Sequence, residues 1–111
     1  MAHRTSEGQI QRAILDALPL LGVVAWRTQS GTRSGGRMHL APSGTPDIVG
    51  YRIRDAKFIA IECKAPGGKP SPEQVAWLAR AQASGVLCGI ARGVDDVVRI
   101  LQDDLRGTAR G

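Results

Sequence analysis

The apolar residues at the start of the chain recur at helical spacing. Between Ile10 and Leu21 they stand three or four positions apart, as on one face of an amphipathic helix. Ser6 and Gln9 have the spacing of a capping box, in which the serine caps the helix and the glutamine side chain reaches back. The pattern therefore predicts a helix from about Ser6 to Leu18–Leu21.

Four short runs rich in β-branched and aromatic residues predict strands. Their ranges are Val23–Gln29, Pro46–Ile53, Lys57–Lys64 and Val86–Ala91. A second helix is predicted between its N-cap Ser71 and Gly85, and a third on the valine stripe that begins near Val94. The order α-β-β-β-α-β-α predicts an α/β domain with a small mixed sheet flanked by helices.

The second and third predicted strands are separated by a short polar break. If Asp55–Ala56 is a two-residue hairpin loop, Asp47 lies opposite Lys64. The same register places Val49 opposite Glu62. Opposed residues share a face, as do residues two apart on one strand, so both acids and the lysine would meet on one surface. A loop of odd length would break this grouping.

Such a grouping has a chemical meaning. Two carboxylates supply the hard oxygen ligands that Mg²⁺ prefers, and the ion keeps waters and accepts phosphate oxygens. A lysine beside them can orient the attacking water or offset charge that develops on a phosphate. The simpler alternative is an ordinary strand pair with one cross-strand Asp47–Lys64 contact, worth a fraction of a kcal/mol.

At these residues the chain resembles the PD-(D/E)xK nuclease superfamily, and more closely its VRR-NUC branch. Pro46-Asp47 matches the PD of the superfamily, and Glu62-Cys63-Lys64 matches its E-x-K. The run from Lys64 through a Gly/Pro turn to Gln74 resembles the VRR-NUC continuation. The resemblance extends from Glu7 to about Gly93 and implies a restriction-endonuclease-like fold with Mg²⁺- or Mn²⁺-dependent nuclease activity.

The resemblance also implies roles for individual residues. Asp47 and Glu62 would hold the metal, together with the backbone carbonyl of Cys63. Lys64 would orient the attacking water or stabilise the transition state. Glu7 would bind a second metal or its water shell.

Two implied site residues have simpler explanations. Extending the apolar stripe of the first helix backwards reaches Glu7, a carboxylate that is costly to bury without a partner. If the first turn overhangs the core, Glu7 merely favours the helix N-terminus. The resemblance has Gln74 supporting the phosphate, with its amide beside Lys64. Alternatively, Gln74 serves only the capping box of Ser71.

The charge balance agrees with nucleic-acid binding without requiring it. Fifteen Lys and Arg, twelve of them Arg, outweigh ten acids and give a net charge of +5. A Gly/Ser-rich loop over residues 30–44 carries Arg33 and Arg37, which are candidates for DNA contact, as is Lys69. A solvated loop without such a role is the alternative.

The remaining features indicate one domain over residues 1–111, with a frayed tail at 107–111. Cys63 and Cys88 lie in apolar runs and are expected to be buried, reduced thiols, and no zinc spacing is present. The sequence shows no signal peptide and no apolar run long enough to span a bilayer, so we expect a cytoplasmic protein.

Stand-alone domains of this kind resemble virus-encoded and bacterial enzymes that act on branched DNA, including four-way (Holliday) junctions, as homodimers. The expected partners are therefore DNA and a second copy of the chain. Two alternatives stay open: a restriction-like or nicking nuclease on ordinary duplex, and a non-catalytic nucleic-acid-binding module.

Overall fold

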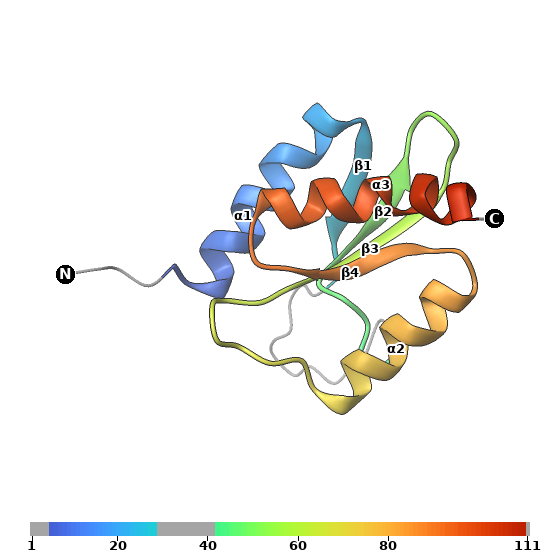
Figure 1. The fold of residues 1–111 in the computed structure, drawn as a ribbon. Helices are drawn as coiled ribbons and strands as arrows, with labels where there is room; N and C mark the ends of the chain where they lie inside the picture. Colours follow the sequence, from blue (N-terminus) through green and yellow to red (C-terminus); the bar gives the residue numbers. More distant parts are fainter. Residues whose placement is uncertain (1–4, 29–41, 111) are drawn as a thin grey trace.

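The computed structural model describes residues 5–28 and 42–110, with backbone alone for residues 103–110. Its elements are α1 (Glu7–Ala17), the 3₁₀ helix η1 (Leu18–Leu21), β1 (Val23–Arg27), β2 (Ile48–Arg52), β3 (Phe58–Cys63), α2 (Pro72–Ala83), β4 (Leu87–Ala91) and α3 (Val94–Arg110) (Figure 1). The predicted order and class are confirmed. No helix in the described ranges is long and apolar enough to cross a membrane.

The helix boundaries differ from the prediction at two places. The first helix tightens into η1, which contains Pro19, and ends at Gly22 in the left-handed conformation that favours glycine. The last helix continues to Arg110, so residues 107–110, expected as a frayed tail, are helical. Ser6 and Ser71 both form the capping boxes that the sequence predicts.

The four strands lie in one mixed sheet in the order β1-β2-β3-β4. The pairs β1–β2 and β2–β3 are antiparallel, and β4 runs parallel to β3 after the α2 crossover. Figure 1 shows α1 and α3 on one side of the sheet and α2 on the other. This is the mixed arrangement that the strand and helix order predicts.

The predicted register of the β2–β3 hairpin was wrong by two residues. Ile48 pairs with Ile61, so continuing the ladder by one residue puts Asp47 opposite Glu62 rather than Lys64. The connection is longer than a two-residue loop because Arg52 donates two hydrogen bonds to Asp55, at 3.0 and 2.7 Å, within the turn. An even shift does not exchange the faces of a strand, so the carboxylates still share one surface.

Each face of the sheet has its own hydrophobic cluster. Under α1 and α3 the cluster includes Ile14, Ile59 and Val97, all fully buried. Under α2 a smaller cluster consists of Val49, Ala60, Leu78 and Cys88. Because residues two apart on a strand share a face, Asp47 and Glu62 belong to the α2 face with Val49 and Ala60.

Candidate active site

Three carboxylates from three separate elements converge at one end of the sheet. Glu7 comes from the first turn of α1, Asp47 directly precedes β2, and Glu62 lies near the end of β3. One oxygen of each lies within 4.8 Å of the others. Glu7 is exposed, Asp47 is partly buried and Glu62 is only 1% exposed. The first turn of α1 therefore brings the Glu7 carboxylate beside the other two, where it is exposed and not buried as the apolar stripe suggested.

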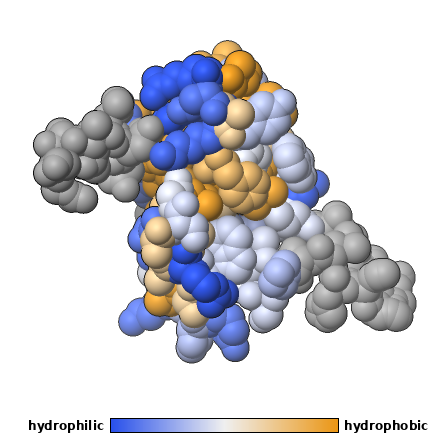
Figure 2. All heavy atoms as spheres, turned by 90° about the vertical axis from the view of Figure 1, so that its right-hand side faces the viewer, coloured by the Kyte–Doolittle hydropathy of each residue, from blue (hydrophilic) through white to orange (hydrophobic). Residues whose placement is uncertain are grey.

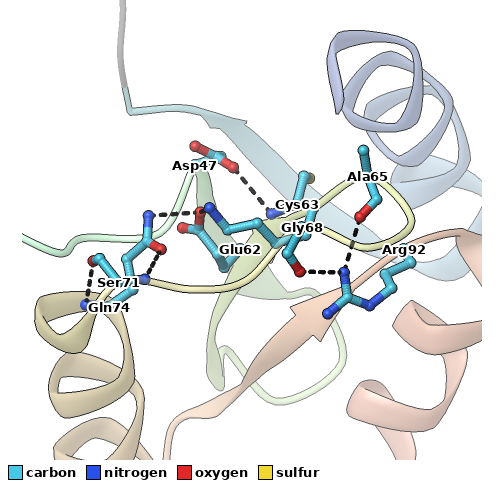
Figure 3. Close-up of polar contacts among 9 residues, drawn as sticks. Asp47, Glu62, Cys63, Ala65, Gly68, Ser71, Gln74 and Arg92 are labelled. Atoms are coloured by element: carbon cyan, nitrogen blue, oxygen red, sulfur yellow. Dashed lines mark hydrogen bonds and ion pairs between the residues drawn. The ribbon is translucent and has the colours of Figure 1, made fainter. Parts of the chain in front are cut away.

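The two strand carboxylates are held by hydrogen bonds (Figure 3). The Cys63 backbone N–H donates to Oδ2 of Asp47 at 3.0 Å, which ties the start of β2 to the end of β3. Oε2 of Glu62 accepts from the Gln74 side chain at 2.9 Å and lies 3.6 Å from the Lys64 ammonium. Oε1 of Glu62 is buried and has no hydrogen-bond partner among the described residues.

Gln74 completes the predicted capping box and also contacts the carboxylate cluster, so the cap is not its only contact. Its side-chain Oε1 accepts from the Ser71 backbone N–H at 2.8 Å. The backbone N–H of Gln74 donates to the Ser71 hydroxyl, which completes the capping box of α2. Its amide nitrogen donates to Glu62. The cap thus fixes the glutamine so that its NH₂ group faces the carboxylate cluster.

The surroundings of Glu62 disfavour its charged form. Burial raises the pKa of Glu62 to about 7, the charge of Asp47 adds to the rise, and Lys64 opposes it. Burial also raises the pKa of Asp47, while the hydrogen bond from Cys63 lowers it. Like-charged carboxylates in a shared, partly buried site repel one another, so a cation between them would lower the electrostatic energy of the cluster.

The residues present fit a divalent cation. A buried carboxylate oxygen without a donor is costly, and a cation would satisfy it. The donor set consists of carboxylate oxygens, which suits Mg²⁺ or Mn²⁺ and not a soft thiophilic metal. The Cys63 thiol lies on the opposite face, where burial raises its pKa to about 12, so it is no thiolate ligand.

A residue that the sequence did not indicate holds the segment after Lys64. Arg92, between β4 and α3, donates from one guanidinium nitrogen to the carbonyls of Ala65 and Gly68, each at 3.0 Å (Figure 3). These carbonyls belong to the turn that follows Lys64. Arg92 therefore fixes the turn that directly follows Lys64, through a contact between segments more than twenty residues apart.

If the cluster hydrolyses phosphodiester bonds, as the sequence resemblance implies, Arg92→Ala should slow that reaction by about tenfold, because charged hydrogen bonds contribute about 1.5–3 kcal/mol and only part of this acts through Lys64. The measurement is single-turnover cleavage of Arg92→Ala, Lys64→Ala and the double variant. In the Lys64→Ala background the second substitution should add little. Arg80→Ala, at an exposed residue near the end of α2, is the control. Additive losses would mean that Arg92 acts independently of Lys64.

Gly44 allows the segment before Asp47 to approach α2. Its φ is +86°, and a Cβ there would lie 2.4 Å from the Glu73 carbonyl oxygen and 2.7 Å from its carbon. Both atoms are backbone and cannot move away cheaply. The absence of a side chain at Gly44 thus brings Asp47 and the Gln74 end of α2 together.

We expect Gly44→Ala to lower the free energy of unfolding by about 2–4 kcal/mol, from left-handed strain plus the clash. Gly67→Ala is the matched control, because its φ is +85° and nothing lies within 4 Å of its Cβ position. Urea unfolding of both variants separates strain from clash. Equal losses would show that the approach to α2 is not tight.

The remaining predicted site residues are Lys69, Cys63, Arg33 and Arg37. Lys69 is exposed on the loop between β3 and α2, and its contact with DNA stays a prediction. The role of the Cys63 carbonyl as a ligand also stays a prediction. Arg33 and Arg37 lie outside the described residues.

A small mixed sheet flanked by helices, with acids at the ends of two central strands, defines a restriction-endonuclease-like α/β domain. The family model of the VRR-NUC domain matches residues 5–95. The chain therefore belongs to the VRR-NUC family, a family of nucleases. Comparisons with curated proteins and with solved structures find no match.

Proposed function

We propose that the chain is a Mg²⁺- or Mn²⁺-dependent DNA endonuclease that hydrolyses phosphodiester bonds. The observation that carries this is the convergence of Glu7, Asp47 and Glu62, with a buried Glu62 oxygen to which none of the described residues donates. Asp47 and Glu62 would hold the metal, with the Cys63 carbonyl completing the set. Glu7, exposed at the rim, would bind a second metal or its water shell.

When bound, the metal polarises the phosphate and makes a nearby water a better nucleophile. The remaining tasks fall to the chain. The Lys64 side chain is 14% exposed, and its ammonium, 3.6 Å from Glu62, orients the attacking water or offsets charge on the phosphate. Gln74 holds Glu62 in place, and its amide would also be available to support the phosphate.

We further propose branched DNA, and four-way junctions in particular, as the substrate of a homodimer. The support is the VRR-NUC membership and the small size of one domain, whose Cα radius of gyration is 14.3 Å. Two copies related by a two-fold axis would present two sites to a junction of the same symmetry. We also propose that the protein is cytoplasmic.

The apolar strand β4 and the valine stripe of α3 are candidates for a dimer surface, but most of their apolar side chains belong to the core. Leu87, Ala91 and Val97 are buried under the helices, and Cys88 packs against α2. These side chains are used within one copy, so a homodimer would need another surface.

The test is cleavage of matched linear, flap and four-way substrates with Mg²⁺, with Mn²⁺ and with excess EDTA. Metal-dependent cutting with preference for the junction, and light scattering at about twice 11.8 kDa, would support the proposal. Equal cutting of linear duplex by a monomer would favour the restriction-like alternative. Binding without cutting in any metal would favour a non-catalytic module.

If Arg33 and Arg37 contact phosphates, alanine at both positions should weaken binding to every DNA sequence about equally. The slope of log affinity against log salt should also fall by about 0.9 per lost contact. Titrations at several salt concentrations measure this. An unchanged slope would remove both arginines from the interface.

A further inference from the structure

The sheet face that carries Asp47 and Glu62 also carries exposed aromatic side chains. Trp26, Tyr51 and Phe58 are 50%, 40% and 43% exposed, respectively. The chain has only four aromatic residues. The fourth, Trp77, packs on the same face from α2. Aromatic residues are thus concentrated on the face that presents the carboxylates.

The strand register places these aromatic residues in a row next to the carboxylates. Trp26 pairs with Val49, and Asp47 lies two residues before Val49, just ahead of β2. Trp26 is therefore diagonal to Asp47, a relation in which Cα atoms lie about 7–8 Å apart. Tyr51 pairs directly with Phe58 and continues the row away from the cluster.

The row is open because α2 covers only part of this face. Leu78 and its neighbours in α2 pack on Val49, Ala60 and Cys88. The β1 side of the face and the far ends of β2 and β3 carry the exposed aromatic residues. Figure 2, which looks onto the end with the β2–β3 turn, shows orange and pale surface beside blue hydrophilic surface.

We propose that Trp26, with Tyr51 and Phe58 beyond it, forms a stacking surface for unpaired bases of a DNA strand whose phosphate lies at the carboxylate cluster. Bases stack on exposed aromatic rings regardless of sequence. The inference rests on the proposed nuclease function and names its substrate class: DNA with unpaired bases beside the cut, as in a flap, an overhang or an opened branch point.

The area of the row favours bases over a second protein copy. A fully exposed aromatic side chain offers about 150–250 Å², so these three together expose roughly 200–350 Å². A stable protein interface needs about 800 Å² from each partner. One or two stacked bases fit the smaller area.

The charges at both ends of the row also suit a nucleic-acid strand. The proposed metal site lies at one end, and Arg54 and Lys57 lie in the turn at the other. Glu62 is the only acid within β1, β2 or β3, and Asp55 in the turn is paired with Arg52. A phosphate backbone that follows the row therefore meets no uncompensated acid on these strands.

The experiment measures binding in EDTA, where no cleavage occurs, by anisotropy of a labelled duplex. One probe carries a single-stranded thymidine arm, and its twin carries the same arm without bases. For the wild-type protein, loss of the bases should weaken binding by about 5- to 150-fold per stacked base. Trp26→Ala should lose the part of this difference that one stacked base contributes, about 5- to 150-fold, while Trp26→Phe should keep most of it.

Two further measurements complete the test. In the Trp77→Phe protein, Trp26 is the remaining tryptophan, and its fluorescence should be quenched by the thymidine arm but not by the baseless arm. Leu20→Ala, at a residue of η1 that is 87% exposed, should behave as wild type.

Equal affinity of the wild-type protein for both arms would overturn the inference. So would a halved mass of Trp26→Ala in light scattering, since a second copy would then cover the row. Base-dependent binding in a protein that cuts nothing would support stacking and refute the nuclease proposal. Metal-dependent cutting without base dependence would do the reverse.

Discussion

Glu62→Gln is expected to lower the cleavage rate by at least about 10³-fold, with little change in the fold. The loss follows from the position of Glu62, which is 1% exposed and lies within 4.8 Å of the other two acids. Glutamine keeps the size and can still accept from Gln74, but it removes the charge that would hold a cation. One lost group that stabilises a transition state costs about 10²–10³ in rate, and a lost metal ligand should cost no less.

Asp47→Asn should behave like Glu62→Gln, because the Cys63 N–H can still donate to the amide oxygen while the charge is gone. Lys64→Ala should differ, leaving metal binding intact and losing about 10²–10³ in rate. Metal binding can be followed separately by the shift in melting temperature with Mn²⁺. This shift should vanish for the two acid variants and persist for Lys64→Ala.

The matched control is Glu73→Gln, at an exposed acid in the first turn of α2 outside the cluster. It makes the same chemical change one residue from Gln74, so it should retain wild-type cleavage. Near-normal cleavage by Glu62→Gln or Asp47→Asn, or cleavage by wild type in excess EDTA, would exclude the proposed metal site.

The sequence predicted the fold because its local signals agree with one another. Both capping boxes, at Ser6 and Ser71, start helices where expected, and apolar spacing gives the buried stripe of α1. The face of the carboxylates was also predicted despite the wrong register. Alternation along a strand has a period of two, so an error of two residues leaves every side chain on its face.

What the sequence could not show depends on contacts between distant side chains. The β2–β3 turn is set by the pairing of Arg52 with Asp55, which no hydrophobic pattern encodes. The hydrogen bonds from Arg92 to the carbonyls of Ala65 and Gly68 join two loops that lie close together only in the folded sheet. The exposure of Trp26 likewise depends on how much of the sheet α2 covers.

The metal-free protein should lose stability as pH rises from 5 to 8. Glu62 has an ordinary pKa of 4.5, which folding raises to about 7. The folded state therefore binds more protons than the unfolded state in this window. Stability from the protonated carboxyl is complete below pH 4.5 and is lost as pH rises through 7. At 1.36 kcal/mol per pKa unit the loss is about 3 kcal/mol.

Glu62→Gln should abolish most of this dependence, because an amide is neutral throughout the range. In EDTA at pH 8 the variant should be about 3 kcal/mol more stable than wild type, and at pH 5 the two should be nearly equal. Adding Mg²⁺ at about 100 times its dissociation constant should stabilise wild type by about 2.7 kcal/mol and leave the variant unchanged. Urea unfolding at each pH, with and without metal, measures both effects.

The pairing of these two effects is what distinguishes a metal site from a merely buried acid. A buried acid that binds no metal would lose stability as pH rises, and Glu62→Gln would remove that loss. Mg²⁺, however, would not stabilise the wild-type protein. A profile for wild type as flat as that of the variant would mean that Glu62 is not strained in the folded protein. Its buried oxygen would then have a partner other than a cation, and the case for the metal would rest on Glu7 and Asp47 alone.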